Sequence, residues 1–415
     1  MTIRLFTLAL ILFSLPVCAQ EVYGDARPDA PELAARGPLP VGVRTVVAEH
    51  ADQVDILRVT AATPDPRSTR KLTLEIWYPA QPAPQQTIYT DFLGAGANNP
   101  ARPNTPFQFN GRAARDAASA SGVYPLVIVS HGYPGSRLQM SYLTENLASK
   151  GYVVVAIDHA ESTRLDKAGF ASTLLNRRLD DLFVLDTVAA WSRAGSGHFL
   201  AGLVDAGRTA LIGYSMGGYG ALNAAGAGIG AAAVAMGPGG KLGVNAQGSF
   251  TPDARVKAVV AFAPWGGAAH IWDAAALAAV RVPVLFVSGD QDDVSGYRDG
   301  VLPLFEGVAH ADRYLLTYKG ARHNVAPNPA PPAAADVEDF MAYAEPVWDS
   351  RRINNINQHF VTAFLGVVLK QQPLQAYLEL APLIETGTAK PEPTEWKGFR
   401  KRTALGLTWR HLPAQ

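Results

Sequence analysis

The chain has 415 residues, of which 48% are hydrophobic and 17% are charged, so it can form a large core and is not intrinsically disordered. Lysine plus arginine and aspartate plus glutamate each number 36. This balance gives no electrostatic reason to expect nucleic acid or an acidic membrane surface as a partner, and it favours a neutral or apolar substrate.

The N-terminus has the pattern of a signal peptide. Arg4 supplies the positive charge, residues 5–15 form an apolar run, and Val17 and Ala19 are the small residues that precede a cut after residue 19. The apolar run is too short to cross a bilayer, so we expect no stable membrane anchor. The sequence therefore predicts that residues 1–19 are removed and that the protein is exported to the periplasm or the extracellular space.

Cys18 is the only cysteine. A lipoprotein signal, with Cys18 as the lipidated residue, is the alternative interpretation, but Val17 directly before it fits that pattern poorly. A chain cut after Ala19 contains no cysteine, which excludes a cysteine nucleophile and a thiolate metal site. Export without disulfides is compatible with a chain long enough to form a sufficient core.

The first part of the mature chain contains few strong elements. Residues 20–40 are rich in Pro, Ala and Gly and are predicted to form a flexible lead-in to a domain that spans 41–383. Strand-like runs occur at 54–59 and 72–78, and the second alternates apolar and polar residues, as a half-exposed antiparallel strand should. Residues 79–122 hold many Pro, Gln and Asn and are predicted to be a loop or insertion.

From residue 124 onward, apolar strands alternate with helical segments. Strands are predicted at 126–130, 153–157, 209–212, 258–262, 284–287 and near 314–318, and helices at about 140–150, 178–192 and 353–370. Strands that are nearly all apolar and alternate with helices indicate a mostly parallel sheet covered on both faces. A Gly- and Ala-rich insertion is expected at about 226–256, and residues 384–415 are expected to be a tail on the surface.

The motif G-x-S-x-G stands at residues 213–217, between an apolar strand and a run of small residues. When this motif joins a strand to a helix, the turn is so tight that the central serine takes a strained backbone conformation. The flanking glycines have no side chain and allow neighbouring backbone to pass close by. The hydroxyl of Ser215 is then exposed at the end of the strand. We therefore predict that Ser215 is a catalytic nucleophile, rather than part of an ordinary glycine-rich turn.

A serine hydroxyl attacks well only when a base removes its proton, and the base is usually a histidine held by a carboxylate. His323 follows the strand predicted near 314–318 and is the expected base. Asp290, Asp292 and Asp293 share the loop after the preceding strand, and Asp292 is favoured as the acid. Asp290 is the next choice, and any of the three could instead cap a turn.

An oxyanion formed at the substrate needs two hydrogen-bond donors. The backbone N–H of Met216, directly after the nucleophile, is the first, and the N–H of Tyr133, in the loop after the strand at 126–130, is the second. His131 in the same loop is expected to support it rather than to act as a base. Trp265 follows another strand and is predicted either to line the substrate pocket or to belong to the core.

No nucleotide-binding glycine motif follows the first strand, and no histidine pair has the spacing and partners of a metal site, so no cofactor or metal is expected. The segment 158–161, Asp-His-Ala-Glu, also follows a strand, but it has no predicted role in catalysis.

Over roughly residues 40–370 the chain resembles the α/β-hydrolase superfamily, and within it the bacterial predicted dienelactone hydrolases, which are similar to platelet-activating factor acetylhydrolases. The segments that carry this resemblance are 40–45 with 77–80, then 130–132, then 213–218. The family implies hydrolysis of carboxylic esters through an acyl-enzyme without a cofactor. True dienelactone hydrolases have a cysteine nucleophile, so Ser215 makes dienelactone a doubtful substrate.

Residues 321–328, which contain His323, are similar to the histidine loop of cutinase-type polyester hydrolases. In that comparison Tyr133 matches the oxyanion tyrosine and Trp265 matches the aromatic clamp. We therefore expect an exported serine hydrolase with an α/β-hydrolase fold that cleaves carboxylic esters, as an esterase, lipase or polyester hydrolase. An amidase, a haloperoxidase-like enzyme or a carbon–carbon bond hydrolase with the same triad is the alternative, and a non-catalytic binding module is a weaker one.

Overall fold

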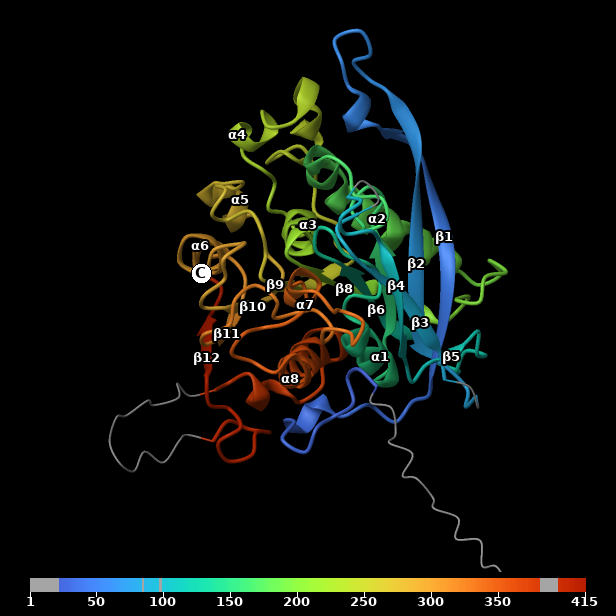
Figure 1. Cartoon of the computed structure of the whole chain (residues 1–415), viewed down its shortest axis with the longest axis vertical. Helices are drawn as coiled ribbons and strands as arrows, with labels where there is room; N and C mark the ends of the chain where they lie inside the picture. The colour runs from blue at the N-terminus through green and yellow to red at the C-terminus, as the bar shows by residue number, and fades with distance from the viewer. Residues whose placement is uncertain (1–21, 84–85, 97–98, 381–394) are drawn as a thin grey trace, which may run out of the picture.

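The computed structural model describes residues 22–83, 86–96, 99–380 and 395–415 (Figure 1). The predicted signal peptide, residues 1–19, lies outside these ranges, as does part of the predicted C-terminal tail.

A ten-stranded sheet runs through the molecule in the order β12-β11-β10-β9-β8-β6-β7-β2-β1-β5. Its strands are β1 (Val41–Val54), β2 (Arg67–Pro79), β5 (Ala114–Arg115), β6 (Tyr124–Ser130), β7 (Val153–Asp158), β8 (Val204–Tyr214), β9 (Val256–Phe262), β10 (Val284–Gly289), β11 (Arg313–Tyr318) and β12 (Leu407–Leu412). The block from β7 to β11 is parallel, whereas β2 and β12 join it antiparallel. The predicted α/β-hydrolase fold with a mostly parallel sheet is confirmed.

Helices cover both faces of this sheet. They are α1 (Ser141–Ser149), α2 (Phe170–Trp191), α3 (Met216–Ala224), α4 (Ala231–Val234), α5 (Ala274–Ala278), α6 (Leu302–Gly307), α7 (Val337–Met341) and α8 (Ser350–Lys370). Short 3₁₀ or π-helical turns lie at Glu32–Ala34, Ile56–Arg58, Pro238–Asn245, Tyr297–Val301 and Gln375–Tyr377.

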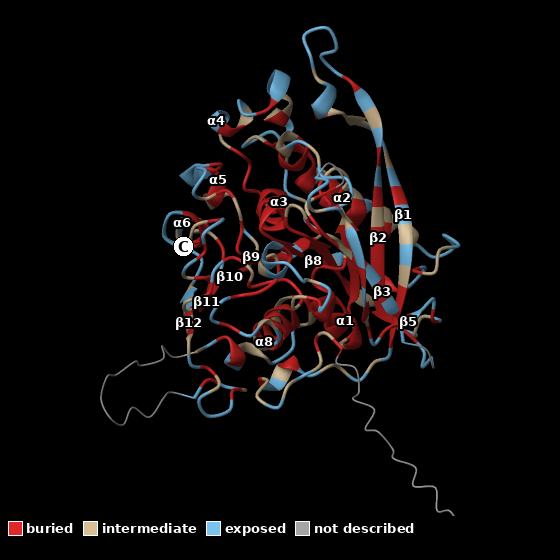
Figure 2. Ribbon diagram, viewed as in Figure 1, coloured by how far each residue is buried: buried red, intermediate tan, exposed pale blue. Residues whose placement is uncertain are grey.

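Alternate residues of the central strands enter two separate apolar layers, as the pleat of a strand requires. In β6, Val127 and Val129 pack in the layer with α1 and α8, and Leu126 and Ile128 pack in the layer with α2 and α3. The central strands are therefore buried on both faces (Figure 2). This burial explains why the sequence pattern of these strands is continuously apolar.

Two predictions for the first strands need correction. The apolar run at 54–59 is not a strand, because β1 ends at Val54, where it pairs with Arg67 at the end of a long hairpin, and Ile56–Arg58 is a 3₁₀ turn. The run at 72–78 lies in antiparallel β2, as predicted, but most of it is buried rather than half-exposed. Its burial follows from its place between β1 and β7, inside the sheet.

The segment 79–122 is more than a loop, because β3 (Ile88–Leu93) and β4 (Thr105–Asn110) form an antiparallel pair in it and β5 joins the main sheet. The segment 226–256 holds α4 and the 3₁₀ turn Pro238–Asn245, and Asn245 accepts a 2.8 Å hydrogen bond from Arg178 of α2.

The described parts of the predicted lead-in and of the predicted tail, residues 22–40 and 395–415, pack against the domain. In the expected flexible lead-in, the N–H of Leu33 donates to Nδ1 of His359 at 3.1 Å, and Arg36 pairs with buried Glu145 at 3.0 Å. In the expected surface tail, β12 pairs with β11 and Trp409 is buried. These segments are held by polar groups of α1 and α8 and by the edge of the sheet. Such contacts cannot be predicted from amino-acid composition.

None of the helices in the described ranges is long and apolar enough to cross a membrane.

Candidate active site

Ser215 lies on a sharp turn between β8 and α3. Its backbone has φ 53° and ψ −113°, a conformation that costs a non-glycine residue about 1–3 kcal/mol. A Cβ on Gly213 would lie 2.1 Å from the carbonyl oxygen of Gly217, and a Cβ on Gly217 would lie 2.0 Å from that of Ser130. The predicted strained serine and the close approach at both glycines are thus present in the structure.

Backbone hydrogen bonds fix this turn against the neighbouring strand β9. The N–H of Ser215 donates to the carbonyl of Phe262 at 2.9 Å, and the carbonyl of Ser215 accepts from the N–H of Trp265 at 3.1 Å. The strained conformation is therefore held by the sheet, and the Ser215 residue as a whole is only 7% exposed.

His323 and Asp292 form a hydrogen-bonded pair in the loops after β11 and β10. Nδ1 of His323 lies 2.9 and 3.1 Å from the two carboxylate oxygens of Asp292. One of these oxygens also accepts the N–H groups of Val294 and Ser295 at 3.0 and 2.9 Å. These donors stabilise the carboxylate, which in turn holds the Nδ1–H tautomer of the ring and leaves Nε2 free to act as a base.

The other two acids of this loop have different partners. Asp290 accepts the N–H of Gly320 at 2.7 Å, and Asp293 pairs with the guanidinium of Arg322. Neither is hydrogen-bonded to His323, so the geometry favours Asp292 among the three candidates.

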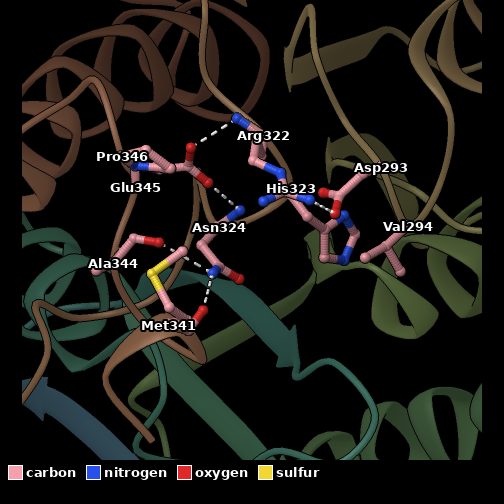
Figure 3. Close-up of a pocket in the computed structure, with 9 residues that line it drawn as sticks. All are labelled: Asp293, Val294, Arg322, His323, Asn324, Met341, Ala344, Glu345 and Pro346. Carbon is pink, nitrogen blue, oxygen red and sulfur yellow. Dashed lines mark hydrogen bonds and ion pairs between the residues drawn. The ribbon is translucent and has the colours of Figure 1, made fainter. Parts of the chain in front are cut away.

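Glu345 fixes the backbone on both sides of His323 (Figure 3). One carboxylate oxygen accepts the N–H of Arg322 and the other accepts the N–H of Asn324, both at 2.6 Å. The pKa of Glu345 is raised, chiefly because the carboxyl is buried. Glu345 could not be predicted from the sequence, because it lies in an irregular segment without a motif.

The histidine loop lies over the end of β8. The ring centroids of Tyr214 and His323 are 5.1 Å apart, and the Tyr214 hydroxyl donates to the side-chain oxygen of Asn324 at 3.0 Å. Within the described ranges, no hydrogen bond joins Ser215 Oγ to the His323 ring. Such a bond often tightens only when substrate binds.

A cavity of about 230 Å³ opens beside His323. Figure 3 shows its lining residues, which are Asp293, Val294, Arg322, His323, Asn324, Met341, Ala344, Glu345 and Pro346.

The two segments that carry the predicted oxyanion donors lie close to Ser215. Met216 is the first residue of α3, where backbone N–H groups have no acceptor inside the helix. The loop that carries Tyr133 is close, because a Cβ on Gly132 would lie 3.6 Å from Cβ of Ser215. Among the hydrogen bonds of the described residues, none uses the backbone N–H of Met216 or Tyr133 as a donor.

Three aromatic rings form a wall next to these donors. The ring of Phe170, at the start of α2, lies 5.4 Å from that of Tyr133 and 5.1 Å from that of Trp265, edge to face in both cases. All three side chains are partly exposed, so Trp265 lies at the rim rather than in the core. Phe170 was missed because the predicted helix at 178–192 starts too late, whereas α2 begins at residue 170.

Among the residues that the structure describes, no group of three or more His, Cys, Asp or Glu side chains is arranged to hold a metal ion.

The chain is similar to a sequence family, to individual proteins and to solved structures. Residues 78–234 and 226–337 match the sequence profile of the family described as PETase: PET hydrolase-like. "Cutinase 2" of Thermobifida cellulosilytica is 28% identical over 212 residues, which are 50% of this chain and 63% of that protein. "Bis(hydroxyethyl) terephthalate hydrolase" of Streptomyces coelicolor is 25% identical over 207 residues, which are 50% of this chain and 52% of the relative.

The chain thus spans little more than half the length of the curated relatives that it matches. A solved ferulic acid esterase from Streptomyces cinnamoneus superposes with a TM-score of 0.54 at 20% identity, over 87% of this chain and 97% of that one. This similarity shows that the two share the fold.

Proposed function

The chain belongs to the PET hydrolase-like family, and from this membership and the geometry of the site we propose that it is a serine hydrolase that cleaves carboxylic esters. Ser215 is the nucleophile, His323 the base and Asp292 the residue that orients His323. The N–H groups of Met216 and Tyr133 form the oxyanion hole. The observation that carries the proposal is the His323–Asp292 pair, whose ring packs on Tyr214, the residue directly before a serine on a strained turn.

The reaction proceeds in two halves. Ser215 Oγ attacks the ester carbonyl carbon while Nε2 of His323 takes its proton, and the two N–H groups hold the oxyanion. The intermediate collapses when His323 returns the proton to the leaving alcohol, which leaves an acyl group on Ser215. Water, deprotonated by His323, then attacks this acyl group and releases the acid and the free serine.

The partly exposed wall of Tyr133, Phe170 and Trp265 supports esters with an aromatic or extended acyl group as substrates, because rings and chains can pack on it. The names of the relatives, cutinases and a bis(hydroxyethyl) terephthalate hydrolase, agree with this class. We include polyesters in the proposal for the same reason. Export through the signal peptide at residues 1–19 is part of the proposal and rests on the sequence pattern alone.

The test is hydrolysis of p-nitrophenyl esters from acetate to palmitate, and of bis(hydroxyethyl) terephthalate, by the mature protein and by Ser215→Ala. We expect wild-type activity and a loss of about 10³-fold or more in kcat for the variant, with its thermal unfolding preserved. Activity of Ser215→Ala near the wild-type level would refute the assignment of the nucleophile.

Matched ester and amide substrates distinguish an esterase from an amidase with the same triad. A serine-reactive phosphonate distinguishes both from a binding module, because it should label Ser215 in the wild type and leave the alanine variant unlabelled.

A further inference from the structure

A second Ser, His and Asp arrangement lies beneath the loop that carries Tyr133. Oγ of Ser130 is 2.7 Å from Nε2 of His159, and Nδ1 of His159 is 3.0 Å from the carboxylate of Asp180. Each of these residues is at most 2% exposed, so no substrate reaches them. The cluster is therefore not a hydrolytic site, and its position suggests that it supports the loop above it.

The guanidinium of Arg177, from α2, connects this cluster to the loop. It donates to the hydroxyls of Ser130 and Ser162 at 3.2 and 2.6 Å. The same group donates to two backbone carbonyls of the loop, those of His131 and Gly132, the latter at 2.9 Å. Arg177 is completely buried, and burying a charge is unfavourable unless its hydrogen bonds and ion pairs compensate.

Buried carboxyl groups lie around this cation. Attraction to Asp181 and Asp180 favours its charged form, although burial lowers the pKa of Arg177 to about 10. The group therefore still carries its charge at neutral pH.

The carbonyl of Gly132 accepts a second hydrogen bond, from the ring of His131. Nε2 of His131 accepts the N–H of His159 at 3.2 Å, so in the neutral ring Nδ1 holds the hydrogen and donates to Gly132 at 2.6 Å. Burial and the charge of Arg177 keep the pKa of His131 well below its usual value, which maintains the neutral ring. One carbonyl is thus held by both a cation and an imidazole.

This carbonyl belongs to the same peptide group as the N–H of Tyr133. The bond between Gly132 and Tyr133 is trans, and in a planar trans peptide the C=O and N–H point in opposite directions. Fixing the carbonyl toward Arg177 therefore directs the N–H away from it. A positive donor on the carbonyl also polarises the peptide group and strengthens the N–H as a donor.

We propose that Arg177 is a positioning residue for the oxyanion hole, because it holds the Gly132 carbonyl so that the Tyr133 N–H faces the oxyanion formed on the Ser215-bound substrate. The inference rests on the proposed function and names a residue that never touches the substrate. Its effect is expected in the transition state and not in substrate binding.

The experiment compares Arg177→Lys with the wild type in ester hydrolysis and in inhibition by a trifluoromethyl ketone, whose serine adduct places an oxyanion in the hole. A lysine cannot reproduce the fork that reaches both carbonyls. We expect kcat to fall and the inhibition constant to rise, each by about 10- to 100-fold, with KM changed by less than about threefold.

Arg178→Lys is the matched control. Arg178 is also a buried arginine of α2, but it donates to Asn245 and to the carbonyl of Val244, and not to the loop that carries Tyr133. We expect it to change stability while kcat and the inhibition constant stay within about threefold of the wild type. Equal losses in Arg177→Lys and Arg178→Lys would mean that Arg177 has only a structural role.

Two further results separate the possible failures. An inactive wild type, or an active Ser215→Ala, would reject the proposed function itself, whereas a folded Arg177→Lys with unchanged kcat and inhibition constant would reject only the role of Arg177. If Arg177→Lys does not fold, Ser162→Ala replaces it. Nη2 of Arg177 donates both to the Gly132 carbonyl and to the Ser162 hydroxyl, and Ser162→Ala removes the second of these partners. We then expect a two- to fivefold loss in kcat without a change in KM, and an unchanged kcat overturns the inference.

Discussion

At the level of single residues, the site depends on donors and acceptors that hold its reactive groups in place. Two backbone N–H groups and the ring of His323 converge on Asp292, and Glu345 holds the backbone on either side of His323. Ser215 keeps its strained conformation because β9 binds its backbone N–H. Pre-organisation of this kind removes the need to rearrange during the reaction.

The three acids of one loop provide a test at this scale. Asp292→Asn should lower kcat by about 10⁴-fold, because an amide in this position favours the wrong tautomer of His323. Asp290→Asn and Asp293→Asn should stay within about tenfold of the wild type, since their partners are Gly320 and Arg322. Steady-state kinetics of the three variants, with circular dichroism as a check of folding, measures this. A larger loss in Asp290→Asn than in Asp292→Asn would mean that the acid is misassigned.

At the level of elements, β12 and α8 close the side of the sheet that carries His323. The ring of Trp409 in β12 stacks on Phe360 of α8 at 4.8 Å, and its N–H donates to the carbonyl of Leu378 at 2.9 Å. Asp349 caps α8 by accepting the N–H groups of Arg351 and Arg352. Strand β12, which lies in the predicted surface tail, is thus packed on the core.

Removing this contact should destabilise the protein. Trp409→Ala is expected to lower the free energy of unfolding by about 3–5 kcal/mol, the usual effect of removing a buried aromatic side chain. Leu405→Ala is the control, because Leu405 is 53% exposed in the same segment and should change stability by less than about 0.5 kcal/mol. Chemical denaturation measures both changes in the free energy of unfolding. A change for Trp409→Ala as small as that for Leu405→Ala would show that β12 contributes little to the core.

At the level of the whole molecule, buried polar groups join the N-terminal segment to the domain. His359 of α8 accepts the N–H of Leu33, and Lys150 donates to the carbonyl of Leu33 and to Thr362. Burial and the nearby charge of Lys150 lower the pKa of His359 to about 3. The folded protein therefore keeps this ring neutral at pH values where the unfolded chain protonates it.

This difference makes stability depend on pH. The folded pKa of His359 lies below its unfolded value of 6.5, so the contribution of this group is present above pH 6.5 and is lost as the pH falls toward 3. Between pH 7 and pH 5 the wild type should lose roughly 2 kcal/mol more than His359→Gln, which cannot titrate. Other titrating groups are common to both proteins and cancel in the comparison. Parallel curves of unfolding free energy against pH for the two proteins would contradict this prediction.

Local sequence patterns were sufficient to predict the central strands and the candidate reactive residues. Apolar runs marked β6 to β11, because strands buried on both faces must be apolar throughout. Ser215, Asp292 and His323 stood out since each follows such a strand in the order that the fold requires. The strain at Ser215 could be expected for the same reason, from the glycines on either side of it.

The contacts between groups that are distant in the chain could be identified only in the folded molecule. Glu345 binds the backbone beside His323, Arg177 binds the loop that carries Tyr133, and β12 completes the sheet edge, yet no motif in the sequence predicts these contacts. Such contacts join residues that are far apart in the chain, so their energy depends on the folded arrangement of several segments rather than on local sequence. The choice among Asp290, Asp292 and Asp293 has the same origin, because all three share one loop and only the fold brings one of them to His323.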